Sequence, residues 1–393
     1  MIINFICDTM SNLKISVSII GGTDGLGKWF AKFLKENDKC NKDNKNNKNN
    51  NRNNNSNNNS NNNNNDFNFD ITITGRNTEK GTTVSQELGV KYCSNNIEAT
   101  KNADIVIIAV PISHTLSVIE EVAPHMAKGS ILMDMTSVKE KPALKMVEFT
   151  KEGVSVIPTH PMFGPSVPSI AEQVVILTPV EKCDNKHFEK VKKFLENAEA
   201  KVIVIEPQKH DEIISVIQGL THFIHISLGS TLRELGISIK DSRNFASPIY
   251  EMMINMVGRI VGQNANLYAD IQMNNDRTTN VHDTFIQECI KLRDTVKNRD
   301  KKAFIEDMEL TSKYFGEETK KGLYYSNKAV NAIVNENMAL KHAIGKEISL
   351  KHIYTGEIYN GVLKNIIEDK LIIKDLKNDK KEYELNIYEF NIL

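Results

Sequence analysis

The sequence predicts an α/β protein in three parts: a mostly parallel sheet with its helices, an all-helical domain and a small β-rich domain. Strand-like apolar runs alternate with helical stretches through about residue 205, which is typical of a parallel sheet. From Pro207 apolar residues recur at helical spacing, and from residue 345 short alternating runs surround turn residues. The predicted parts are an N-terminal extension at 1–13, the sheet domain at 14–206, the helical domain at 207–344 and the β-rich domain at 345–393.

The composition favours a protein that acts on a small molecule. The 393 residues are 40% hydrophobic and 25% charged, with a formal net charge of −1, so no basic surface is indicated for nucleic acid or an anionic membrane. Five scattered cysteines without a Cys-x-x-Cys pair suggest neither disulfides nor a metal site and fit the reducing cytoplasm. The first residues do not resemble a signal peptide, and no later run reaches the length of a bilayer span.

A glycine-rich turn follows the first predicted strand, Lys14 to Ile20, and precedes a helix at 28–36. It reads Gly21-Gly22-Thr23-Asp24-Gly25-Leu26-Gly27. In a Rossmann-like βαβ unit such a turn lets the pyrophosphate of a dinucleotide approach the backbone at a helix N-terminus. Read as Gly-x-Gly-x-x-Gly, the middle position holds Asp24, whose carboxylate would face a phosphate unfavourably. Read as Gly-x3-Gly-x-Gly, the turn fits the spacing of short-chain reductases. Any tight turn can look similar, but the strand, turn and helix in this order favour a nucleotide site.

Residues 41–65 interrupt this unit between the first helix and the second strand. They contain 18 asparagines and few apolar side chains. Such a tract cannot offset the entropy lost on ordering, so we expect a disordered surface insertion.

The second predicted strand, Asp70 to Thr74, ends in Gly75-Arg76-Asn77. In NAD-binding proteins an acidic residue here holds the ribose 2′-hydroxyl, whereas an arginine accommodates the 2′-phosphate of NADP. Because no Asp or Glu stands at this strand end, NADP is the expected cofactor and NAD the alternative. A solvated loop arginine is the competing interpretation.

Two further strand ends carry candidate catalytic residues. The runs that end at Asp134 and Pro158 read as buried strands, which places Ser137 and His160 just past strand ends, where open α/β sheets put their chemistry. The His160 ring exchanges a proton near neutral pH, and Pro161 restricts its backbone. We take His160 as the candidate catalytic residue; a His-Pro turn without function is the competing interpretation.

The helical domain begins with an apolar stripe that runs from Ile213 to Leu228. Helices so long and apolar often bury one face against a second subunit, so we expect a homodimer. Arg259 lies among apolar residues of a later helix, where its charge needs a partner. A substrate anion would supply one.

Together these motifs resemble those of prephenate dehydrogenases. The similarity covers most of residues 14–320 and, as a set at these spacings, is highly specific. The matching stretches are Gly21-Gly22 with Gly27, Val110-Pro111, Ser137-Val138-Lys139, His160 to Pro165, His210-Asp211, Gln218 to Phe223, Ser247 to Tyr250, Gly258-Arg259, Gln263 and Leu267 to Asp270.

The resemblance implies oxidative decarboxylation of prephenate to 4-hydroxyphenylpyruvate in tyrosine biosynthesis. Hydride leaves the ring carbon that bears the hydroxyl, carbon dioxide leaves the opposite carbon, and aromatisation drives the reaction. By matching motif, the site residues would be His160 as general base on the ring hydroxyl, Ser137 orienting that histidine or the nicotinamide, Arg259 binding a substrate carboxylate and His222 as a further substrate contact. The expected cofactor contacts are Gly21, Gly22, Thr23, Gly25, Leu26, Gly27, Arg76, Val110 and Pro111. The 13 residues before the first strand are too few for the chorismate mutase domain of some relatives.

Each assignment has an alternative. Ser137 is also placed to cap the next helix, and His222 to pack in the core with His225 one turn on. His210-Asp211 reads as a structural pair at a helix start rather than as a ligand site. Within the class the alternative activity is arogenate or cyclohexadienyl dehydrogenase. Outside it, Asp24 favours a catalytically silent, nucleotide-sensing regulator.

Overall fold

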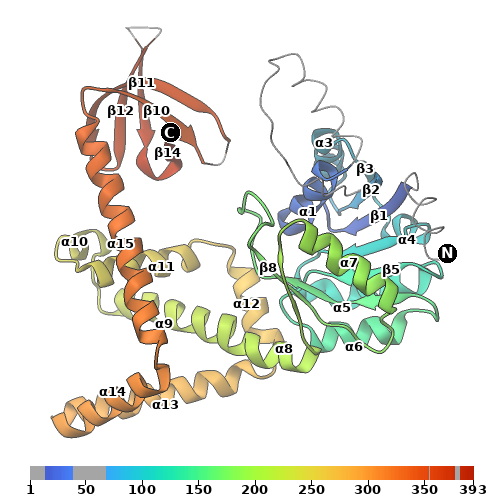
Figure 1. The fold of residues 1–393 in the computed structure, drawn as a ribbon, viewed down its shortest axis with the longest axis horizontal. Coiled ribbons are helices and arrows are strands. Elements are labelled where there is room, and N and C mark those ends of the chain that lie inside the picture. Colours follow the sequence, from blue (N-terminus) through green and yellow to red (C-terminus); the bar gives the residue numbers. More distant parts are fainter. Residues whose placement is uncertain (1–13, 39–67, 354, 377–380) are drawn as a thin grey trace, which may run out of the picture. The chain divides into compact units, whose positions relative to one another are not determined.

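A computed structural model describes residues 14–38, 68–353, 355–376 and 381–393 (Figure 1). The extension at 1–13 lies outside the described residues. So does the Asn-rich tract at 41–65, which the sequence predicts to be disordered. The chain divides into two compact units, Met1–Ile237 with Met256–Ile290 and Ser238–Asn255 with Lys291–Leu393. The domain bounds expected from the sequence differ from this division and stay predictions.

The first unit is built on a six-stranded parallel sheet in the order β3-β2-β1-β4-β5-β6. This order confirms the predicted Rossmann-like domain. Helices cover both faces, because one cluster of buried apolar side chains joins the sheet to α1, α3 and α7 (Asn185–Asn197), and a second joins it to α5 and α6. The elements are β1 (Lys14–Ile20), α1 (Gly25–Glu36), β2 (Asn68–Thr74), α3 (Thr78–Leu88), β3 (Lys91–Cys93), α4 (Asn96–Lys101), β4 (Ile105–Ile108), α5 (Ile112–Val122), η1 (Ala123–His125), β5 (Ile131–Asp134), α6 (Glu140–Phe149) and β6 (Ser155–Ile157).

The chain leaves this sheet at Pro158 and enters a second sheet one residue later. The second sheet has the order β7-β8-β9, with β7 antiparallel to β8 and β8 parallel to β9. His160 therefore lies beyond the end of β6, as expected, but inside a short strand that pairs it with Ile176 rather than in a loop. The elements are β7 (Thr159–Pro161), β8 (Val174–Leu177), α7 (Asn185–Asn197) and β9 (Lys201–Val204).

After β9 the first unit becomes helical, as predicted. Three segments, α8 (Pro207–Ile214), η2 (Ser215–Leu220) and α9 (Thr221–Glu234), follow one another directly, and the middle one is π-helical. Within the described residues, this stretch is long and apolar enough to cross a bilayer by length and composition alone, which corrects the expectation that no run is. Its start is packed inside the protein, because His210 and Asp211 are buried and hydrogen-bonded to neighbouring elements. The other helices are α11 (Pro248–Val261) and α13 (Thr278–Lys297), each shared between the units, and α12 (Ala265–Asn274).

The second unit ends in a five-stranded antiparallel sheet, which confirms the predicted β-rich domain. The strand order is β13-β12-β11-β10-β14. Its core joins Leu340 of α15 to buried residues such as Leu363 and Ile373. The elements are α10 (Ile239–Arg243), α14 (Lys301–Phe315), α15 (Glu318–His342), β10 (Glu347–His352), β11 (Ile358–Ile367), β12 (Lys370–Asp375), β13 (Glu382–Asn386), η3 (Ile387–Glu389) and β14 (Phe390–Ile392).

Candidate active site

The glycine turn after β1 closes tightly against the loops that follow β2 and β4. Gly21 has φ +87°, and a side chain there would come within 2.8 Å of the Ala109 carbonyl oxygen and 2.9 Å of Val110 Cγ1. A side chain at Gly27 would come within 2.5 Å of the Gly21 carbonyl oxygen. A side chain at Gly75 would likewise collide with the side chain of Thr23. Three strand-end loops thus meet at one edge of the sheet, an arrangement that fits a dinucleotide.

The first turn of α1 leaves backbone amides free for an anion. Asp24 is the N-cap, and its Oδ1 accepts a hydrogen bond of 2.8 Å from the Gly25 amide. The amides of Leu26 and Gly27 come next, where no preceding helical carbonyl is available. The Asp24 carboxylate is paired with the Lys80 ammonium at 2.5 Å, and this contact holds its pKa below the usual value. The carboxylate expected to oppose a phosphate therefore stays ionised but has a counter-charge in Lys80.

The predicted base, His160, is held on both sides of its ring. Its Nδ1 lies 2.9 Å from Nε2 of His210, and its Nε2 lies 3.5 Å from the side-chain nitrogen of Gln218. His210 in turn places its Nδ1 2.7 Å from Oδ1 of Asp211. Burial, followed by the nearby His210 and Lys139, holds the pKa of His160 well below its ordinary value. The ring is therefore neutral at neutral pH and able to accept a proton.

A buried ion pair lies beside this histidine. The Lys139 ammonium contacts the Asp134 carboxylate and donates to the Thr159 carbonyl at 2.9 Å, while the Thr159 amide donates to Asp134 Oδ1 at 3.0 Å. Both charged side chains are fully buried. Because Thr159 precedes His160, these bonds fix the backbone that carries the imidazole.

Ser137 is half-buried in the turn between β5 and α6. It does not cap the helix, because α6 begins at Glu140 with Lys139 as its N-cap residue. The hydrogen bonds found for the His160 ring go to His210 and Gln218. The part of Ser137 in orienting His160 or the nicotinamide therefore stays a prediction.

His222 lies one helical turn after Gln218 and packs against Tyr268 of α12, with ring centroids 4.5 Å apart. Its Nδ1 is buried without a hydrogen-bond partner in the structure, and burial, with a smaller effect of His225, lowers its pKa to about 4. Burial raises the pKa of Tyr268, and the positive charge of Arg259 partly opposes that rise. Arg259 is exposed on α11 and near this tyrosine. The helical segment that carries both residues thus places Gln218 at His160 and His222 at Tyr268, the tyrosine near Arg259.

Four residues of this arrangement were not selected from the sequence: Lys139, His210, Asp211 and Gln218. His210 and Asp211 were interpreted as a structural pair and do form one, but His210 also contacts His160 through its other ring nitrogen. Lys139 resembles any surface lysine in the sequence, yet it is fully buried. The only signal in the sequence for these groups was the adjacent His210 and Asp211 at a predicted helix start, considered together with His160.

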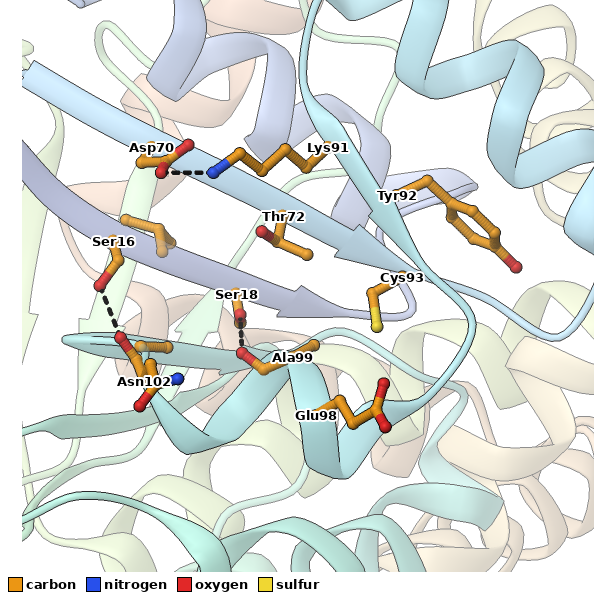
Figure 2. Close-up of a pocket in the computed structure, with 12 residues that line it drawn as sticks. Ser16, Ser18, Asp70, Thr72, Lys91, Tyr92, Cys93, Glu98, Ala99 and Asn102 are labelled. Atoms are coloured by element: carbon orange, nitrogen blue, oxygen red, sulfur yellow. Dashed lines mark hydrogen bonds and ion pairs between the residues drawn. The ribbon is translucent and has the colours of Figure 1, made fainter.

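A pocket of about 350 Å³ lies elsewhere, against β1, β2, β3 and α4 (Figure 2). Its walls include Ser16, Thr72 and Cys93, and an ion pair of 2.7 Å joins Lys91 to Asp70 at its edge. None of the predicted site residues lines it. It is therefore separate from both the glycine turn and His160.

Two family models match the chain. The prephenate dehydrogenase nucleotide-binding domain matches residues 65–204, and the prephenate dehydrogenase dimerization domain matches residues 206–310. A probable arogenate/prephenate dehydrogenase of Methanocaldococcus jannaschii is 51% identical over 385 residues, which are 98% of this chain and 78% of that protein. A T-protein of Haemophilus influenzae is 34% identical over 55% of this chain and 56% of its own length.

Solved structures share the fold at low identity. The prephenate dehydrogenase from A. aeolicus, in complex with hydroxyphenyl propionate and NAD+, has a TM-score of 0.57 and 17% identity, over 76% of this chain and 96% of its own. The Synechocystis arogenate dehydrogenase has a TM-score of 0.54 and 17% identity, over 79% of this chain and all of its own.

Proposed function

Because the chain belongs to the prephenate dehydrogenase family, we propose that it converts prephenate to 4-hydroxyphenylpyruvate and carbon dioxide, with NADP as hydride acceptor. The observation that carries this proposal is the buried, neutral His160, held on one side by His210 and on the other by Gln218. His160 and the dinucleotide-binding turn both lie past the carboxyl ends of strands of one parallel sheet, and a neutral imidazole at that edge suits the removal of a hydroxyl proton during hydride transfer.

In this mechanism His160 holds the hydroxyl proton while the ring is oxidised. The O–H bond breaks and its proton moves to the imidazole. A bound nicotinamide would supply the redox chemistry by accepting the hydride from the same ring carbon. Loss of carbon dioxide from the opposite carbon then makes the ring aromatic, and the proton returns to the oxygen as a phenol. Atoms and charge balance without a further reactant.

Arg259 and His222 are proposed to bind the substrate. A guanidinium binds a carboxylate through two parallel hydrogen bonds, and Arg259 is exposed near Tyr268. The neutral His222, whose buried Nδ1 lacks a partner in the structure, offers a hydrogen bond to a second polar group. Ser137 remains proposed as a contact to the nicotinamide or to His160.

The cofactor is proposed to lie over the glycine turn, with its pyrophosphate at the amides of Leu26 and Gly27. Glycines at positions 21, 22, 25 and 27, with Thr23, Val110 and Pro111, would surround it. Arg76 supports NADP over NAD, because it is exposed at the end of β2 beside the packed pair of Gly75 and Thr23.

Arogenate is the second candidate substrate. The relative from Methanocaldococcus jannaschii is named for both arogenate and prephenate, and the two substrates differ only in the side chain. A silent nucleotide sensor is less well supported, because Lys80 supplies a counter-charge to Asp24. We further propose a homodimer formed through the helical region, which the dimerization-domain match supports, and a cytoplasmic location.

Steady-state turnover on prephenate and arogenate, each with NAD and NADP, tests the proposal. Formation of 4-hydroxyphenylpyruvate with NADP at the highest kcat/KM would support it. A preference for arogenate would overturn the assignment of prephenate as substrate, and a preference for NAD would overturn the assignment of NADP as cofactor. His160→Asn should lower kcat by about a hundredfold or more, the usual scale for a positioned base, while cofactor binding persists. Undiminished turnover by that variant would remove His160 from the mechanism.

A further inference from the structure

The proposed base and two side chains behind it form a row of three buried groups. His160 Nδ1 lies 2.9 Å from His210 Nε2, and His210 Nδ1 lies 2.7 Å from Asp211 Oδ1. The residues are 2%, 1% and 4% exposed, so bulk water does not reach these contacts. Both separations are hydrogen-bond distances, and each contact therefore requires one proton between its two atoms.

The carboxylate determines where those protons lie. Asp211 Oδ1 also accepts a hydrogen bond from the Lys139 amide at 2.8 Å, and Oδ2 accepts one from the Glu140 amide at 2.9 Å. Burial alone would raise the pKa of Asp211, but the hydrogen bonds from His210 and from these amides hold it below its usual value. An ionised carboxylate can only accept. The proton of the His210–Asp211 contact therefore belongs to His210 Nδ1.

The same reasoning fixes the next proton. Burial lowers the pKa of His210, with Asp211 opposing the shift, so at neutral pH the His210 ring is neutral and its Nε2 has a free electron pair. The 2.9 Å contact must then be donated by His160 Nδ1. A neutral imidazole that carries its proton on Nδ1 has its free electron pair on Nε2.

We propose that Asp211 and His210 are positioning residues that fix the tautomer of His160, so that its Nε2 is the atom that accepts the substrate proton. This inference takes the identity of the substrate from the proposed function. The arrangement of proton donors and acceptors from Asp211 to His160 does not depend on which substrate is bound.

The helix that carries His210 also delivers the group on the other side of the ring. Over the eight residues from His210 to Gln218 a regular α-helix turns roughly 800°, which would leave the two side chains roughly 80° apart. The π-helical segment Ser215–Leu220 holds more residues per turn, so Gln218 is rotated back toward the direction of His210. The side-chain amide of Gln218 thereby reaches a point 3.5 Å from His160 Nε2.

The test compares His210→Gln with His210→Leu in the full-length protein. Both variants remove a buried imidazole, but the glutamine offers an amide oxygen that accepts from His160 Nδ1, whereas leucine offers nothing. His187→Gln is the matched control, since His187 lies on α7 and contacts none of these residues. We expect His210→Gln to keep kcat within about tenfold and His210→Leu to lose about a hundredfold or more, because a wrongly held tautomer costs about 10⁴ in a serine-protease triad. KM for substrate and cofactor should change little.

A second readout does not require turnover. In protein labelled with ¹⁵N in histidine, the ring nitrogen shifts assign the tautomer of His160, with His160→Asn identifying its signals. The proposal predicts a protonated Nδ1 in the wild type and a mixture of tautomers in His210→Leu. Equal kcat for the two His210 variants, or a protonated Nε2 in the wild type, would overturn it. Absence of turnover by the wild type on every substrate would refute only the proposed function, because the tautomer remains measurable.

Discussion

The indole N–H of Trp29 donates a hydrogen bond of 2.9 Å to the carbonyl of Val167. Trp29 lies on α1, two residues after the last glycine of the nucleotide turn, and Val167 lies in the loop that follows His160. The indole also packs edge-on against Phe163 of that loop, with ring centroids 5.0 Å apart. The helix proposed to bind the cofactor and the loop beyond the base are therefore joined by one side chain.

Trp29 should report cofactor binding directly, because it is the single tryptophan of the chain. Its emission overlaps the absorption band of a reduced nicotinamide, so saturating NADPH should quench it and transfer energy to the nicotinamide. A fluorescence titration measures the effect, and Trp29→Phe supplies the blank. Emission that does not respond to a saturating dinucleotide would contradict the site proposed at α1.

The rate should resist acidification more than a free imidazole would. Burial, His210 and Lys139 hold the pKa of His160 well below the ordinary value of 6.5. The base must be neutral to accept a proton, and it stays neutral as the pH falls past 6.5. A profile of kcat/KM against pH should therefore remain flat through pH 6.5 and decline only at lower pH. A half-maximal rate at or above pH 6.5 would show that another group or a normal histidine controls the reaction.

Folding stability should decrease on the acid side. The pKa of His222 is about 4 in the folded chain against 6.5 ordinarily. Between these values the unfolded state binds the proton and the folded state does not, so stability is present above pH 6.5 and is lost as the pH falls toward 4. Thermal unfolding from pH 7 to 5 should show Tm falling, with a shallower fall in His222→Gln. If Tm falls equally steeply with pH in the wild type and in His222→Gln, His222 is not a source of the acid destabilisation.

Removing the buried ammonium should destabilise the fold severely. Lys139→Met leaves the Asp134 carboxylate buried without its counter-charge, and breaking such a pair costs about 3–5 kcal/mol. Lys141→Met is the matched control, because Lys141 forms an exposed ion pair of 2.7 Å with Asp276 and its loss should cost about 0–1 kcal/mol. Chemical denaturation measures both. Similar unfolding free energies for the two variants would mean that the Lys139 charge is not needed.

Arg76 should set the cofactor preference. If it binds the 2′-phosphate, Arg76→Ala removes a charged hydrogen bond and lowers kcat/KM for NADP by about tenfold or more, while kcat/KM for NAD changes little. Parallel assays with the two cofactors provide the internal control. An equal loss with both would assign Arg76 a general structural role instead.

The succession of strands and helices was predictable because it depends on local patterns. The apolar run at β1, the glycine turn and the start of α8 at Pro207 lie where the sequence placed them. The change of sheet at Pro158 was not visible, because three residues of β7 pair with a strand that lies 14 or more residues further on. Local patterns do not specify such partners.

The surroundings of His160 escaped prediction for the same reason. His210 is 50 residues away in the chain, and the Lys139 amide that binds Asp211 is 72 residues away. Lysine is normally a surface residue, so nothing in the sequence marked Lys139 as buried. The histidine itself could be selected from its motif, but the groups that hold its ring required coordinates.

The passage from β6 to β7 across Pro158 also limits how this protein can change in length. Neighbouring side chains of an extended chain point in opposite directions, so one inserted residue before Thr159 would turn the threonine hydroxyl toward His210 and the imidazole away. Insertions and deletions should therefore be tolerated in exposed turns such as the one at Glu368 and Asp369 between β11 and β12, yet be absent from this short connection in every active relative.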